Sequence, residues 1–149
     1  MDLGSDFDLA TRVESWSNQR LLLLNAGAVH GPLHAVAGAD LAAWEHTITV
    51  NTIGLVRPLA PLLPVMIKSG WGRVVQVSSA ASVGPAGGYN SAYAVSKSAA
   101  DTVLAHLAAE LAGSGVTVHS LHPGEIRSAM WADIAAQSAG RSELAGFTA

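Results

Sequence analysis

Hydrophobic residues gather in three short runs, at residues 20–24, 73–77 and 116–121, and small or turn-forming residues follow each run. The second and third runs are rich in valine, which is typical of strands covered on both faces of a parallel sheet. The stretches between the runs are too long for hairpins and carry helical periodicity. The order strand, helix, strand, helix, strand predicts an α/β fold with a parallel sheet and right-handed crossovers.

Two helices are expected between these strands. Asp40 has the residue type of an N-cap for a helix that runs through Trp44 and Ile48 toward Val50. A second helix is expected over residues 93–111, with Gly113 and Gly115 ending it.

Three prolines recur at three-residue spacing within the helix expected after Asn51, namely Pro58, Pro61 and Pro64. An interior proline removes one backbone hydrogen bond and costs about 3 kcal/mol. We therefore expect a kink in this helix, or a break with a fresh helical start near Pro61.

The composition narrows the class of protein. With 149 residues, 50% of them hydrophobic and 13% charged, the chain has the profile of one globular domain, and disorder is excluded. The net charge is −3 and no basic stripe is present, so no nucleic-acid partner is expected. There is no cysteine, and the six histidines lack metal-ligand spacing, so no metal site is expected.

The termini and apolar runs bear on location. The N-terminus carries acidic residues and no basic region, so it does not have the pattern of a signal peptide. The strongly apolar stretch at residues 21–28 is too short to span a membrane. A cytoplasmic protein with no membrane partner is expected.

The strand ends carry the candidate chemistry. Ligands of open parallel sheets bind beyond the carboxyl ends of the strands, where Asn25, Ser78, Ser79 and the turn at residues 123–124 are expected. Tyr93 and Lys97 lie four residues apart, on one face of the second helix. A neighbouring cation favours the phenolate and lowers the pKa of the tyrosine, so the pair suits proton transfer to or from an alcohol or carbonyl oxygen.

The string from Tyr93 to Lys97, preceded by Ser78 and Ser79, resembles the YxxxK signature of the short-chain dehydrogenase/reductase family. Other family elements occur in the family's order: Leu24-Asn25-Ala26-Gly27 for NNAG, Asn51 and Gly54 for NxxG, Pro64-Val65-Met66 for PxM, and Pro123-Gly124-Glu125-Ile126-Arg127-Ser128 for PGxxxT.

The resemblance implies a partial Rossmann-like, doubly wound parallel sheet and an oxidoreductase that uses NAD or NADP, with the choice between them open. By this resemblance, Tyr93 is the general acid/base. Lys97 lowers the Tyr93 pKa and holds the nicotinamide ribose. Ser79 orients the substrate carbonyl, and Asn51 holds a water that links Lys97 to solvent. The residues implied to contact the cofactor are Asn25, Ala26, Gly27, Tyr93, Lys97, Pro123, Gly124, Ile126 and Ser128.

The chain departs from the family pattern in two ways. Ser79 precedes Tyr93 by one residue more than is usual, so Ser78 and Ser82 remain alternatives. The family's Gly-rich turn, TGxxxGIG, and its last strand have no counterpart here. Because that turn holds the pyrophosphate, we expect residues 1–149 to be one incomplete NAD(P)-binding domain that binds dinucleotide weakly or not at all.

Two functions remain open. The first is hydride transfer between a nicotinamide and a small alcohol or carbonyl substrate. The second is a catalytically silent interaction module. In either case the resemblance implies a homo-oligomer, formed through the helix after Asn51 and the helix that contains Tyr93.

Overall fold

The protein is described here from a computed structural model, which places residues 21–24, 32–84 and 88–147. The strands are β1 (Leu21–Leu24), β2 (Gly72–Val77) and β3 (Val116–Leu121), and they form one parallel sheet in the order β1-β2-β3. Leu21 pairs with Arg73, and Gly72 pairs with Val116. The predicted parallel α/β sheet is confirmed, and the carboxyl ends of its strands lie at one edge.

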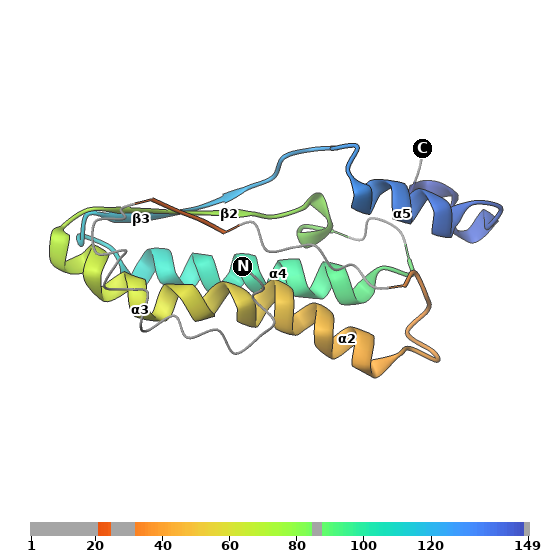
Figure 1. Ribbon diagram of the computed structural model, residues 1–149, viewed down its shortest axis with the longest axis horizontal. Helices are drawn as coiled ribbons and strands as arrows, with labels where there is room; N and C mark the ends of the chain where they lie inside the picture. Colours follow the sequence, from red (N-terminus) through yellow and green to blue (C-terminus); the bar gives the residue numbers. More distant parts are fainter. Residues whose placement is uncertain (1–20, 25–31, 85–87, 148–149) are drawn as a thin grey trace.

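Helices α3 (Gly54–Ser69) and α4 (Ser91–Glu110) lie side by side on one face of this sheet (Figure 1). Helix α2 (Leu41–Ile48) leads into α3 through a π-helical turn, Thr49–Ile53. Helix α5 (Ala129–Ser138) lies beyond the carboxyl ends of the strands and is followed by a 3₁₀ segment, Ser142–Phe147 (Figure 1). A short 3₁₀ helix, Ala80–Ser82, follows β2.

Local signals account for the ends of the helices. The Asp40 carboxylate accepts hydrogen bonds from the backbone N–H groups of Ala42 and Ala43, at 3.0 and 3.2 Å, so the predicted N-cap is confirmed. Helix α4 begins two residues before the predicted start and ends one residue before the predicted end. Gly113 and Gly115 then turn the chain into β3 with φ angles of +80° and +82°.

Of the two expectations for this helix, a kink or a break near Pro61, the break is wrong. Helix α3 runs without interruption through Pro58, Pro61 and Pro64. A proline removes only one hydrogen bond and its fixed φ is helical, and the burial of Leu55, Leu59 and Met66 offsets the loss. The irregular stretch lies earlier, in the π-helical turn, and π turns of this kind occur often at functional sites.

The hydrophobic core lies between the sheet and the two long helices. On β2, Val74 and Gln76 point into this layer, while Val75 and Val77 on the other face of the strand are only partly buried. The buried members of the core are Leu55, Leu59, Met66, Val74, Ala100, Leu104, Leu107, Leu111 and Val116. This packing sets α4, and with it Tyr93 and Lys97, against the carboxyl end of β2.

One helical stretch among the described residues, Leu41–Ser69, is long and apolar enough to cross a membrane by length and composition alone. At 29 residues, this stretch is longer than the apolar run at residues 21–28 that the sequence singled out. Its inward residues Leu55, Leu62 and Met66 are buried inside the protein. The core helix of a soluble protein passes the same test, and 44% of the most apolar window of this stretch is buried inside the protein.

Candidate active site

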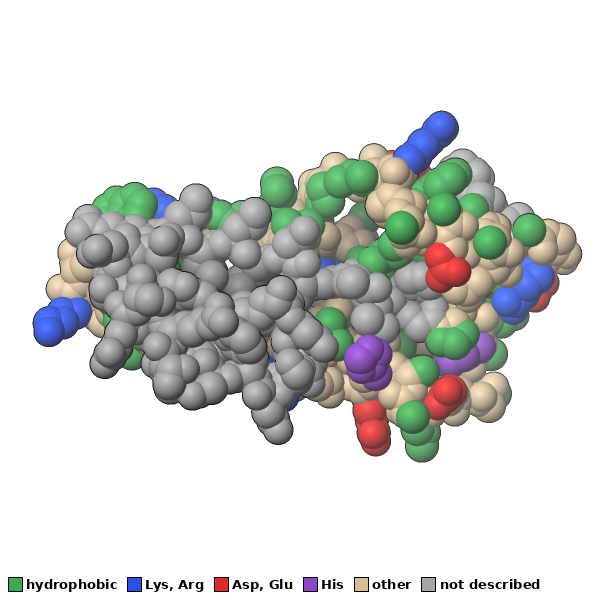
Figure 2. Space-filling model, in the orientation of Figure 1, with side chains coloured by type: hydrophobic (Ala, Val, Ile, Leu, Met, Phe, Trp, Pro, Cys, Tyr) green, Lys and Arg blue, Asp and Glu red, His purple; other side chains and the backbone are tan. Residues whose placement is uncertain are grey.

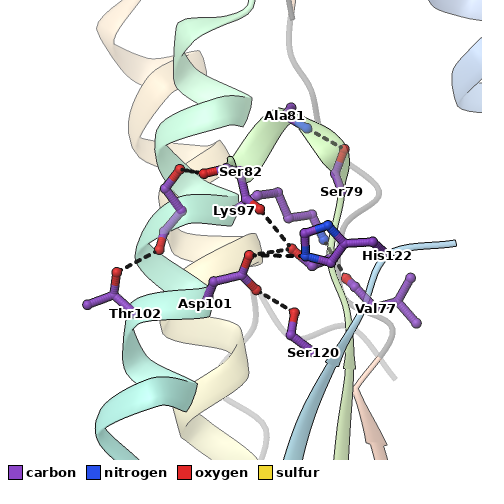
Figure 3. Close-up of polar contacts among 11 residues, drawn as sticks. Val77, Ser79, Ala81, Ser82, Lys97, Asp101, Thr102, Ser120 and His122 are labelled. Atoms are coloured by element: carbon purple, nitrogen blue, oxygen red, sulfur yellow. Dashed lines mark hydrogen bonds and ion pairs between the residues drawn. The ribbon is translucent and has the colours of Figure 1, made fainter. Parts of the chain in front are cut away.

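The candidate site lies where β2 ends and α4 begins. Ser78 and Ser79, two of the candidate site residues, follow directly after β2. Ser79 caps the short 3₁₀ helix, since its hydroxyl accepts a hydrogen bond from Ala81 N at 3.3 Å. Tyr93 and Lys97 lie one turn apart in the first half of α4. Figure 3 shows Lys97 extending from α4 toward Val77, the last residue of β2, near Ser79.

The Ser79 hydroxyl and the Tyr93 phenol are electrostatic neighbours, and the influence of Ser79 favours the phenolate. Burial raises the pKa of Tyr93 above its ordinary value, and the influence of Ser79 lowers it only in part. The expectation that Lys97 brings the Tyr93 pKa below its ordinary value is therefore wrong here. The Lys97 ammonium lies 5.8 Å from the centroid of the Tyr93 ring, and the desolvation of the phenol outweighs any effect of this cation.

Lys97 is almost fully buried, with 2% of its surface exposed. Its Nζ donates to the carbonyl oxygen of Val77 at 3.0 Å, which anchors the ammonium at the end of β2. Burial lowers the pKa of Lys97, and the negative charge of Asp101 opposes that shift.

Asn51 lies in the π-helical turn and is buried beside α4. Its Nδ2 donates to the Ser96 hydroxyl at 2.9 Å. That hydroxyl in turn donates to the backbone carbonyl oxygen of Tyr93 at 2.7 Å. Thr52 donates to Ser96 O at 3.0 Å. Ser96, which the sequence did not single out except as part of YxxxK, therefore joins the Asn51 turn to the segment that carries Tyr93 and Lys97.

The two adjacent serines face different partners. Ser79 meets Tyr93, whereas Ser78 donates to Asp101 Oδ2 at 2.8 Å and lies 3.5 Å from the Ser82 hydroxyl. Of the three serines that the sequence left open, Ser79 is the one that influences the pKa of the Tyr93 phenol.

Asp101, Ser120 and His122 form a polar group that the sequence analysis missed. Asp101 lies one turn beyond Lys97 on α4, so Tyr93, Lys97 and Asp101 share one face of the helix. The four-residue spacing of Tyr93, Lys97 and Asp101 is the sequence feature from which the place of Asp101 could have been predicted.

The remaining predicted cofactor contacts divide into two groups. Pro123, Gly124, Ile126 and Ser128 lie in the exposed stretch between β3 and α5. Ser128 caps α5, since its hydroxyl accepts from Trp131 N at 3.2 Å. Asn25, Ala26 and Gly27 lie outside the described residues. Within the part of the chain that the structure places, no group of three or more metal-ligating side chains occurs.

The chain is similar in sequence and in fold to known proteins. The sequence profile of the short chain dehydrogenase family matches residues 9–139. A probable NADP-dependent dehydrogenase of Haemophilus influenzae is 34% identical over 116 residues, which are 78% of this chain and 45% of that protein. An uncharacterized NAD-dependent oxidoreductase of Mycobacterium tuberculosis is 34% identical over 136 residues, covering 87% of this chain and 48% of the relative.

The solved structure of an NAD⁺-bound xylitol dehydrogenase superposes with a TM-score of 0.82 over 95% of this chain and 56% of that one; at 24% identity it shows the likeness of the folds. The chain spans about half the length of the curated relatives it matches. Its Tyr93-to-Lys97 motif stands at the carboxyl edge of a parallel sheet, and the family profile covers most of its length. The chain belongs to the short-chain dehydrogenase/reductase family.

Proposed function

We propose that this chain carries the proton-transfer centre of an NAD(P)-dependent oxidoreductase that interconverts an alcohol and a carbonyl compound. The observation that carries the proposal is the position of the Lys97 ammonium, which donates to Val77 O at 3.0 Å and lies 5.8 Å from the centroid of the Tyr93 ring. A hydroxyl, a phenol and a buried cation at one strand end suit a reaction in which the charge of a substrate oxygen changes.

In this proposal Tyr93 exchanges a proton with the substrate oxygen. In the direction of reduction the phenol donates its proton to the developing alkoxide, and in the direction of oxidation the phenolate takes the proton from the alcohol. Ser79 donates a hydrogen bond to the same oxygen, and the charge of Lys97 favours the phenolate whenever it forms. Asn51 holds the water through which Lys97 exchanges protons with solvent.

The residues present fit the nicotinamide half of the cofactor. Lys97 offers a buried ammonium anchored at the end of β2, and the segment of residues 123–128 exposes its backbone beyond β3. When bound, the nicotinamide supplies or accepts the hydride, and the protein positions it. The relatives include proteins named for NAD and for NADP, so both remain candidates.

The test separates the two halves of the cofactor. Saturation-transfer NMR with nicotinamide mononucleotide should show contact with the chain, and 5′-AMP should show much less. The chain has two lysines, Lys68 and Lys97, which offer a matched pair of variants. Lys97→Met should remove the contact and Lys68→Met should keep it, since Lys68 is exposed at the end of α3. A folded chain with no contact in either form would contradict the proposal.

Whole dinucleotides give a second measurement. Fluorescence titration with NADH and NADPH should show weak binding or none, because no Gly-rich pyrophosphate turn occurs in the sequence. Saturable binding in the micromolar range would show that the site is built without that turn.

The proposal extends to partners and location. The substrate is a small alcohol or carbonyl compound, and copies of the chain associate through α3 and α4. Exposed apolar side chains support the association, since Val56 and Ile67 on α3 and Val95 on α4 are 40–47% exposed. In the coloured part of the face drawn in Figure 2, Lys and Arg side chains are mixed with Asp, Glu and His and form no basic patch, and the proposal includes no nucleic-acid partner. A cytoplasmic location belongs to the same proposal.

A further inference from the structure

The Asp101 carboxylate lies one helical turn after Lys97 on α4. Asp101 reaches from α4 to the carboxyl ends of two strands (Figure 3). Its Oδ1 accepts a hydrogen bond from Ser120 of β3 at 2.6 Å, and its Oδ2 accepts one from Ser78 at the end of β2 at 2.8 Å. His122 Nε2 lies 3.5 Å from Oδ2.

These bonds hold the carboxylate in its ionised form. Burial alone raises the pKa of Asp101, but the hydrogen bonds from Ser120, Ser82 and Ser78 and the electrostatic influence of His122 outweigh burial and lower it. Short hydrogen bonds of this kind favour the charged acceptor.

Asp101 and Lys97 are one helical turn apart, and the same strand end contacts both. Lys97 donates to Val77 O at 3.0 Å, and Ser78, the next residue, donates to Asp101. An ammonium that is 2% exposed carries a desolvation penalty, which a fixed negative charge one turn away reduces.

We propose that Asp101 is a positioning residue of this site, whose carboxylate ties the ends of β2 and β3 to α4 and keeps the buried Lys97 ammonium charged. It acts through Lys97 and touches neither substrate nor cofactor. The groups around it are Lys97 on α4, Ser78 and Ser82 after β2, and Ser120 and His122 on and after β3. The contribution of Asp101 to catalysis rests on the proposed function. The electrostatic interaction between Asp101 and Lys97 does not depend on that function.

The lysine content of the chain makes the link measurable. With Lys68→Arg, Lys97 is the single lysine, and its ¹³Cε resonance in lysine-labelled protein reports its titration alone. Asp101→Asn should move the Lys97 midpoint to lower pH. Asp101→Glu, which keeps the charge, should restore it toward the parent. Glu110→Gln, which removes one negative charge from the exposed end of the same helix, should leave it in place.

A purely structural clamp predicts a different pattern. Ser120→Ala removes one hydrogen bond but keeps the carboxylate, so it should lower the urea midpoint and leave the Lys97 midpoint unchanged. If Asp101→Asn also lowers only the urea midpoint, the proposal is overturned.

The parent chain provides a readout that needs no variant of Asp101. The Lys97 resonance should show a second inflection in acid as the Asp101 carboxylate is protonated, and a flat acid limb overturns the proposal. If nicotinamide mononucleotide does not contact the chain but the Lys97 titration shows the acid inflection, only the proposed function is rejected. If nicotinamide mononucleotide contacts the chain but the Lys97 titration shows no acid inflection, only the role of Asp101 is rejected.

Discussion

The Asn51 side-chain amide lies 2.9 Å from the Ser96 hydroxyl, and this bond ties the π-helical turn between α2 and α3 to α4 beside Lys97. Both side chains are buried, so neither has water as a substitute partner. The relation makes Ser96 a structural support of the candidate site.

Ser96→Ala should lower the free energy of unfolding by about 1–3 kcal/mol, because it removes the acceptor of a buried amide. Urea unfolding followed by circular dichroism measures the change. Thr102→Ala is the matched control, since its exposed hydroxyl bonds only to Ser98 O within the same helix. Equal losses in the two variants would contradict the importance of the Asn51 bond.

Tyr93 should titrate above its ordinary pKa of 10.0, because burial disfavours the phenolate. The chain has two tyrosines, so Tyr89→Phe leaves Tyr93 as the single phenol, and absorbance at 295 nm follows it. Ser79→Ala should move the midpoint still higher, since the influence of Ser79 lowers the Tyr93 pKa. A midpoint below the ordinary value would show that burial is not the dominant influence.

Gly115→Ala should destabilise the fold by about 3 kcal/mol or more, through left-handed backbone strain and a collision. A Cβ at Gly115 would lie 1.9 Å from Gly70 O, where the turn before β3 meets the end of α3. Gly113 has a similar φ but no atom within 4 Å of an added Cβ. Gly113→Ala should therefore cost only about 1 kcal/mol, and urea midpoints that fall equally would refute the close approach.

Asp101 should make the protein sensitive to acid. Its pKa is lower in the folded chain than in the unfolded one, so its stabilising contribution is complete above the unfolded value, near pH 4, and is lost as pH falls through the folded value. The stability gap between the parent and Asp101→Asn should narrow from pH 7 to pH 3 in urea unfolding. The stability difference between the parent and Glu110→Gln over the same pH range serves as the control. A stability difference for Asp101→Asn that does not change with pH would contradict the lowered pKa of Asp101.

Val95→Glu should weaken self-association about tenfold or more, because it places a charge in the exposed apolar surface of α4. Light scattering after size exclusion measures the mass across a dilution series. Val36→Glu is the control, since Val36 is 65% exposed in the loop before α2. If the parent chain is monomeric at every concentration, the proposed association through α3 and α4 fails.

Local and periodic features of the sequence were enough to predict the parallel sheet and the main helices. Valine-rich runs, the Asp40 cap and the glycines after α4 act over a few residues, so their consequences are readable without tertiary contacts. The prolines of α3 show the limit of such signals. Their local preference predicted a kink or a break, and the helix continues without a break because Leu55, Leu59 and Met66 are buried in the core.

The sequence by itself determined the family, the strand order along the chain and the spacing that puts Tyr93 and Lys97 on one helical face. Only the tertiary structure decided which serine meets the phenol, which way burial moves the Tyr93 pKa, and that Asp101 joins α4 to the ends of β2 and β3. The physical reason is that spacing within one helix is set by local geometry. Desolvation and hydrogen bonds between distant segments exist only once the chain has packed.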